Sequence, residues 1–92
     1  MADRDPQRVL AGFLTPEGRL HTIPSKHAKL LVVLDHVAQR FELGRVYPEA
    51  EVNEVLNELH PDHAALRRYL VVHGFLHRED GHYWRGGGAV DV

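Results

Sequence analysis

Two adjacent arginines, Arg67 and Arg68, carry the clearest binding chemistry in this sequence. A guanidinium group donates paired hydrogen bonds, and it can therefore bind a guanine edge or a phosphate. The arginines fall in residues 62–73, where apolar side chains recur at helical spacing, so we expect them on the exposed side of a helix that enters the major groove of DNA. The predicted DNA contacts are His63, Arg67, Arg68, Val71 and, on the hairpin that follows, Arg78.

The two arginines also have a structural alternative. Glu54 and Glu58 belong to the preceding predicted helix, and an ion pair to one of them would occupy an arginine in packing rather than in DNA binding. The hairpin is also unfavourable for phosphate, because Glu79 and Asp80 at its tip cancel the charge of its two arginines. Both roles stay open, with one arginine available for each.

Histidine is unusually frequent, with eight in the chain, which raises the question of a metal site. The histidines with ligand-like spacing are His60 and His63, His73 and His77, and His82. They fall in different predicted elements, and a structural zinc site without any cysteine is unusual. We interpret them as surface or partly buried side chains and predict no metal and no cofactor.

Catalytic chemistry has little support in the sequence. Hydroxyl nucleophiles are limited to Thr15, Thr22 and Ser25, and Ser25 is better explained as a helix cap. Residues 86–88 are glycines that follow a predicted strand but precede no helix, so they do not form a phosphate loop, and no nucleophile elbow is visible. We predict that the chain is not an enzyme.

Aromatic side chains offer another way to bind nucleic acid. Tyr47, Tyr83 and Trp84 could form a platform on which bases stack. Neighbours on a strand point to opposite faces, so only one of Tyr83 and Trp84 can point inward. We expect Trp84 in the core against the longest helix and Tyr83 at the surface, because aromatic rings contribute most when they fill a core.

A helix and a hairpin are needed to hold these side chains in place. Asp62 is the expected N-cap of helix 62–73, and Gly74 can close its far end in the left-handed conformation. Residues 75–78 and 82–85 then predict an antiparallel hairpin, since the turn between them contains a glycine.

The preceding residues predict a helical framework. Residues 26–41 have the longest apolar pattern and predict the central helix, with Ser25 as its N-cap. Pro48 is expected at the first position of a further helix, 48–59. The shorter expected elements are a helix that starts at Pro6, an edge strand at 19–23 and a two-residue strand at 46–47.

Composition and charge limit the class of protein. The 92 residues include no cysteine, no apolar run long enough to span a membrane and no secretory signal, so we expect a cytoplasmic location and no membrane partner. Residues 1–47 carry seven Lys/Arg and five acids, whereas residues 48–92 carry four Lys/Arg and eight acids. The half that is predicted to contact DNA is thus the acidic half, which counts against phosphate binding.

The order of elements predicts the fold class. A mostly helical chain that ends in helix, glycine and hairpin is typical of a winged helix-turn-helix, an α+β fold with a small β-hairpin. Residues 1–85 are expected to form a single domain, and 86–92 a flexible tail.

Several short motifs over residues 19–85 resemble those of a known family. They are Pro24-Ser25-Lys26, Gly44-Arg45, Glu51-Val52-Asn53, Leu66-Arg67-Arg68 and Tyr83-Trp84-Arg85, together with Phe41, Tyr47, Leu56, His60, Asp62, Leu70, Gly74, Leu76, Arg78 and Gly81. On these residues the chain resembles the bacterial domain-of-unknown-function family 2087, whose members occur alone or after an ArsR-type helix-turn-helix in transcriptional regulators. The resemblance implies a role in regulation. The chain departs from the family at Tyr69, where an acid is usual, and at Ile23, where an aromatic residue is usual.

Two functions from different classes follow from these observations. The first is a DNA-binding transcriptional regulator of winged-helix type that binds double-stranded DNA. The second is a non-enzymatic protein–protein interaction module, in which the acidic surface engages a basic protein partner or the N-terminal helix forms a homodimer. The adjacent arginines and the regulatory context favour the first.

Overall fold

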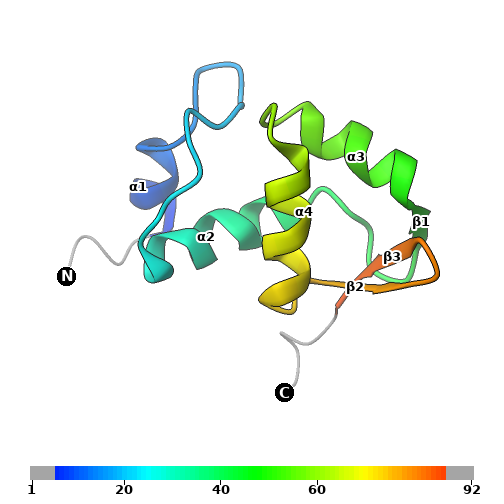
Figure 1. Cartoon of the computed structure of the whole chain (residues 1–92). Coiled ribbons are helices and arrows are strands. Elements are labelled where there is room, and N and C mark those ends of the chain that lie inside the picture. Colours follow the sequence, from blue (N-terminus) through cyan, green and yellow to red (C-terminus); the bar gives the residue numbers. More distant parts are fainter. Residues whose placement is uncertain (1–5, 87–92) are drawn as a thin grey trace.

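The computed structural model describes residues 6–86, which form four helices and one three-stranded antiparallel sheet (Figure 1). The helices are α1 (Pro6–Ala11), α2 (His27–Ala38), α3 (Glu49–Asn57) and α4 (His63–Val72). The strands are β1 (Val46–Pro48), β2 (Leu76–Glu79) and β3 (His82–Arg85). The fold is therefore mixed α+β, as expected. Apart from Gly86, the tail predicted to be flexible lies outside the described residues.

The sheet is built around β3, which lies between β1 and β2. Asp80 and Gly81 join β2 to β3 with φ angles of 54° and 76°, and two consecutive positive φ values are typical of a tight type I′ hairpin turn. The turn is also tied to α3, because the Glu49 backbone N–H donates to the Gly81 carbonyl at 3.0 Å. The predicted hairpin is confirmed, with its first strand one residue later than the predicted 75–78, and the strand predicted at 46–47 is confirmed and extends to Pro48.

The hydrophobic core takes side chains from α2, α3, α4 and the inner face of the sheet. The residues with no exposed surface are Val33, Leu34 and Val37 of α2, Val52 and Leu56 of α3, and Leu66 and Leu70 of α4. Their recurrence at spacings of three and four gives each helix one apolar face. These faces meet, so α4 is held in place by its inner side and leaves its outer side free.

The prediction for Trp84 and Tyr83 was wrong. Tyr83 is only 1% exposed, whereas Trp84 is partly exposed and stacks on His77 with ring centroids 5.9 Å apart. Pairing of Tyr83 with Tyr47 places both phenol rings on the inner face, and alternation then turns Trp84 to the outer face. The phenol hydroxyl also finds an acceptor there, in the side chain of Glu49.

Helix α2 is shorter at both ends than predicted. Lys26 is its N-cap residue, with an extended backbone and no side-chain capping bond, so Ser25 lies too early to cap it. After Ala38 the chain continues in tighter turns, in which the Phe41 N–H donates to the Ala38 carbonyl at 3.0 Å. Phe41 is nevertheless buried, at 1% exposed. The apolar pattern therefore placed its side chain in the core correctly but overestimated the length of the helix.

Two other predicted boundaries need correction. Residues 19–23 form no regular strand: Leu20 makes only an isolated antiparallel bridge with Leu14, and its N–H donates to the Leu59 carbonyl at 2.8 Å. Pro48 ends β1 and precedes α3, which begins one residue later and ends two residues earlier than the predicted helix 48–59. The predicted cap of α4 is confirmed, since the Asp62 carboxylate accepts from the Ala65 N–H at 3.2 Å. Gly74, with φ of 82°, closes that helix as expected.

Candidate nucleic-acid interface

A groove of about 380 Å³ lies between the outer side of α4 and the hairpin. We call it the arginine groove; its lining residues are Ala64, Arg67, Arg68, Val71 and Val72 of α4, Arg78 of β2 and Tyr83 of β3. It brings together four of the five predicted contact residues. The fifth, His63, opens α4 but does not line the groove, and its Nδ1 atom is buried without a hydrogen-bond partner.

Arg67 is the anchored member of the groove. It is partly buried, and its guanidinium donates to the side-chain oxygen of Asn53 on α3. The structural alternative correctly expected a contact with α3, but the acceptor is an amide rather than a glutamate. Glu58 pairs instead with Arg40, at 3.5 Å. The charge of Arg67 is therefore oriented by Asn53 without being neutralised.

Arg68 and Arg78 are the exposed members. The Arg68 guanidinium lies 5.4 Å from the ring centre of Tyr69, and that of Arg78 lies 5.9 Å from the ring centre of Tyr83. Contacts of this kind stabilise a cation over an aromatic face and leave its N–H donors available. Within residues 6–86 neither arginine forms an ion pair, so both can bind an anion.

Glu49 is an acid that lies near Arg67 and Arg78. The Tyr83 hydroxyl donates to its Oε1 at 2.8 Å. This hydrogen bond, followed by the charges of Arg67 and Arg78, lowers the pKa of Glu49 below its ordinary value. Burial raises the pKa of the Tyr83 phenol, and the hydrogen bond to Glu49 and the negative charge of Glu49 raise it further. Glu49 thus stays ionised and offsets part of the positive charge of the groove.

The histidines do not gather into a metal site. Within the part of the chain that the structure describes, no three His, Cys, Asp or Glu side chains are grouped to hold a metal ion. His60 serves the turn before α4, where its Nδ1 accepts from the Asp62 N–H at 3.0 Å. His73 faces His27 with ring centroids 5.4 Å apart, whereas His77 stacks on Trp84.

Sequence reasoning missed three lining residues of the groove. Ala64 and Val72 lie four residues before and after Arg68, so helical spacing would have placed all three on one side of α4. Tyr83 was missed because the wrong face was chosen for β3. The lining of the groove therefore includes more apolar and aromatic side chains than the predicted contacts did.

Among residues 6–86, no helix combines the length and the hydrophobicity needed to cross a membrane.

A family model described as "uncharacterized protein conserved in bacteria (DUF2087)" matches residues 19–85, which include α2, the sheet, α4 and the whole arginine groove. No curated protein matches the chain. No solved structure matches it either.

Proposed function

We propose that this chain, which belongs to the DUF2087 family of bacterial proteins, is a winged-helix domain that binds double-stranded DNA through the arginine groove and acts in transcription regulation. The observation that carries the proposal is the convergence of Arg67, Arg68 and Arg78 from α4 and the hairpin on one groove. Phosphate neutralisation by such cations supplies most nonspecific DNA affinity. Arginine can also read a guanine edge from a helix in the major groove.

The order of elements supports a winged-helix assignment. Helices α3 and α4 follow each other directly, and α4 leads into the β2–β3 hairpin (Figure 1). In a winged helix-turn-helix, the second of the paired helices enters the major groove and the hairpin reaches the flanking backbone. On this assignment Arg67 and Arg68 contact the major groove of DNA, and Arg78 contacts a phosphate of the backbone.

Local pairing reduces the objection that residues 48–92 are acidic. Glu51 forms an ion pair with Arg45 at 2.8 Å, and Glu58 pairs with Arg40 at 3.5 Å. Glu49 is held by Tyr83. Glu51 in α3 and Glu58 just after it are thus paired with cations from residues 1–47, whereas Arg68 and Arg78 form no ion pair within residues 6–86.

The proposal is tested with a double variant, Arg68→Ala with Arg78→Ala. Both side chains are exposed and make no hydrogen bond to other residues within 6–86, so the fold should be unaffected. Loss of the Arg68 contact alone should weaken duplex binding by about 1–3 kcal/mol, or at least about fivefold, and loss of the Arg78 phosphate contact should weaken it further. The plot of log affinity against log salt should also become shallower by about 0.9, because only Arg78 is assigned to a phosphate.

A matched control removes the same charge elsewhere. The double variant Arg8→Ala with Lys29→Ala alters a surface of α1 and α2 that shares no residue with the arginine groove, and it should keep the affinity and salt slope of the wild type. Binding is measured by mobility shift at low salt on a random-sequence duplex library. Equal loss in the two double variants would show that net charge alone attracts DNA, and the groove assignment would then be rejected.

A protein-interaction module is the second candidate. It is favoured by two exposed apolar side chains, Val46 in the edge strand β1 at 56% exposed and Leu43 just before that strand at 58%. Exposed apolar residues at a sheet edge are typical of contact surfaces. Wild-type protein that fails to bind any duplex at low salt would favour this function over DNA binding.

A further inference from the structure

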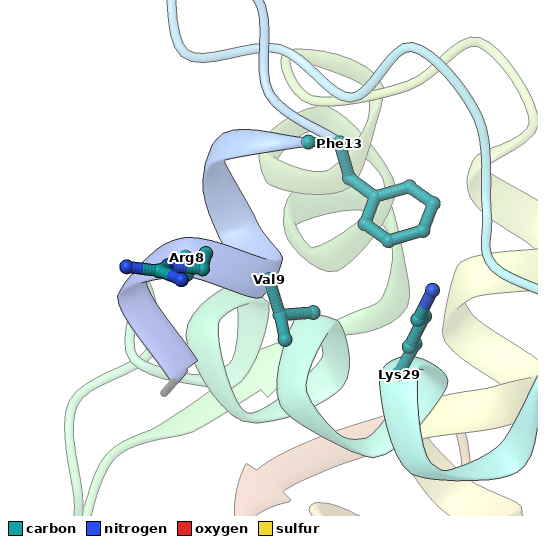
Figure 2. Close-up of a pocket in the computed structure, with 5 residues that line it drawn as sticks. Arg8, Val9, Phe13 and Lys29 are labelled. Carbon is teal, nitrogen blue, oxygen red and sulfur yellow. The ribbon is translucent and has the colours of Figure 1, made fainter. Parts of the chain in front are cut away.

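We propose that a second cavity, between α1 and α2, binds a small organic anion that has an apolar body. The cavity has a volume of about 410 Å³ and is lined by Arg8, Val9, Gly12, Phe13 and Lys29 (Figure 2). This volume lies within the range of pockets that hold small molecules. The cavity shares no residue with the arginine groove, so the proposal does not depend on DNA binding.

The walls of the cavity suit a hydrocarbon or an aromatic ring. Figure 2 shows the Val9 side chain pointing from α1 towards α2, and the Phe13 ring lying over the end of Lys29. Val9 and Phe13 are only partly buried, so each keeps apolar surface that a ligand would remove from water. Gly12 lines the cavity without a side chain, and a Cβ atom there would make only an ordinary contact with the Val9 carbonyl oxygen, at 3.5 Å, so a larger residue can be introduced at this position.

The charge of the cavity selects an anion. Lys29 rises from α2 towards the Phe13 ring, whereas the Arg8 guanidinium lies on the outward side of α1 (Figure 2). Neither cation forms an ion pair within residues 6–86, and the first turns of α1 and α2 contain no acid. A carboxylate at the rim would therefore meet Lys29 directly and gain additional attraction from Arg8.

Lys29 also lines a second, smaller cavity that adjoins the first. Phe13 and Lys29 also line a cavity of about 250 Å³, whose other cation is Lys26. The Lys29 ammonium is thus the charge common to both spaces, and Lys26 belongs to the smaller one alone. We therefore assign the anionic head to Lys29 and the apolar body to the space between Val9 and Phe13.

Octanoate is a suitable probe because it joins a carboxylate to a short hydrocarbon chain. The full chain is titrated below the micelle-forming concentration, and amide shifts are followed by NMR. Saturable shifts should concentrate at Val9, Gly12, Phe13 and Lys29. Octan-1-ol, which lacks the charge, should bind about three- to tenfold more weakly, and octylammonium more weakly still.

Two pairs of variants separate charge from shape. Lys29→Gln should weaken octanoate binding about three- to tenfold, while Lys26→Gln should stay within about twofold of wild type. Gly12→Leu should fill the cavity and abolish saturable shifts, whereas Ala11→Leu adds the same side chain at an exposed neighbour outside the lining and should keep them. The amide spectra of the unliganded variants establish that each is folded.

Several results would overturn the assignment. Shifts that are scattered or do not saturate would mean that octanoate has no site here. Equal binding of octanoate and octan-1-ol would remove the anion specificity. Equal weakening by Lys26→Gln and Lys29→Gln would show general attraction to the positive end of α2, and undiminished binding in Gly12→Leu would place the ligand elsewhere.

Discussion

The inward position of Tyr83 makes a quantitative prediction about stability. Tyr83 is 1% exposed, and an aromatic side chain of this kind buries roughly 150–250 Å². At about 25 cal/mol per Å², the transfer contribution is roughly 4–6 kcal/mol, and core aromatic-to-alanine changes cost about 3–5 kcal/mol. Tyr83→Ala should therefore lower the free energy of unfolding by about 3–5 kcal/mol.

Trp84→Ala is the matched comparison on the same strand. Trp84 stacks on His77 at the outer face and is partly exposed, so its truncation should cost only about 1–2 kcal/mol. Both variants are measured by urea unfolding with far-ultraviolet circular dichroism as the common signal. Tyr83→Phe, which keeps the ring and loses the hydrogen bond to Glu49, should fall between wild type and Tyr83→Ala. A greater loss for Trp84→Ala than for Tyr83→Ala would refute the inward position of the phenol.

Two further predictions concern a helix cap and pH. Asp62→Ala should lower the free energy of unfolding by about 1 kcal/mol, because the carboxylate caps α4. Ser25→Ala removes no cap and should change the free energy of unfolding by less than about 0.5 kcal/mol. Equal effects of the two variants in urea unfolding would contradict the cap assignment. Because the Tyr83 hydrogen bond lowers the pKa of Glu49, its ionised form stabilises the fold above the ordinary value of 4.5, and this contribution is lost as pH falls through the lower folded pKa. The stability difference between wild type and Glu49→Gln should thus be larger at about pH 7 than at about pH 2.5, and a difference independent of pH would argue against the pKa shift.

The helices and the hairpin were predictable because their signals are local. Asp62 and Gly74 mark the ends of α4 by backbone chemistry that requires no knowledge of the rest of the fold. The failed predictions depended on distant partners. Residues 19–23 alternate like a strand, but Leu20 forms only an isolated bridge with Leu14 and a hydrogen bond to Leu59. The face that β3 buries was set by pairing with Tyr47, which is far away in the sequence.

The candidate site was predictable for the same reason, and to the same extent. Helical spacing placed Arg67, Arg68 and Val71 on one element, and the hairpin signal added Arg78, so these four meet in the groove. The partner of Arg67 could not be chosen from sequence, because Asn53 and the glutamates of α3 lie at similar distances along the chain. The cavity beside α1 was not predicted, since it depends on how a six-residue helix docks against α2.

The central place of β3 has a consequence for how the chain folds as it is synthesised. Both outer strands pair with β3, yet β3 follows every other described helix and strand in the sequence. Until residues 82–85 have left the ribosome, β1 has no partner, and the backbone edge beside Tyr47 stays open to other chains. Long-range pairing of this kind slows folding relative to a bundle with local contacts alone. A nascent chain that stalls just before His82 would therefore hold most of its helices and still be the species most prone to aggregate.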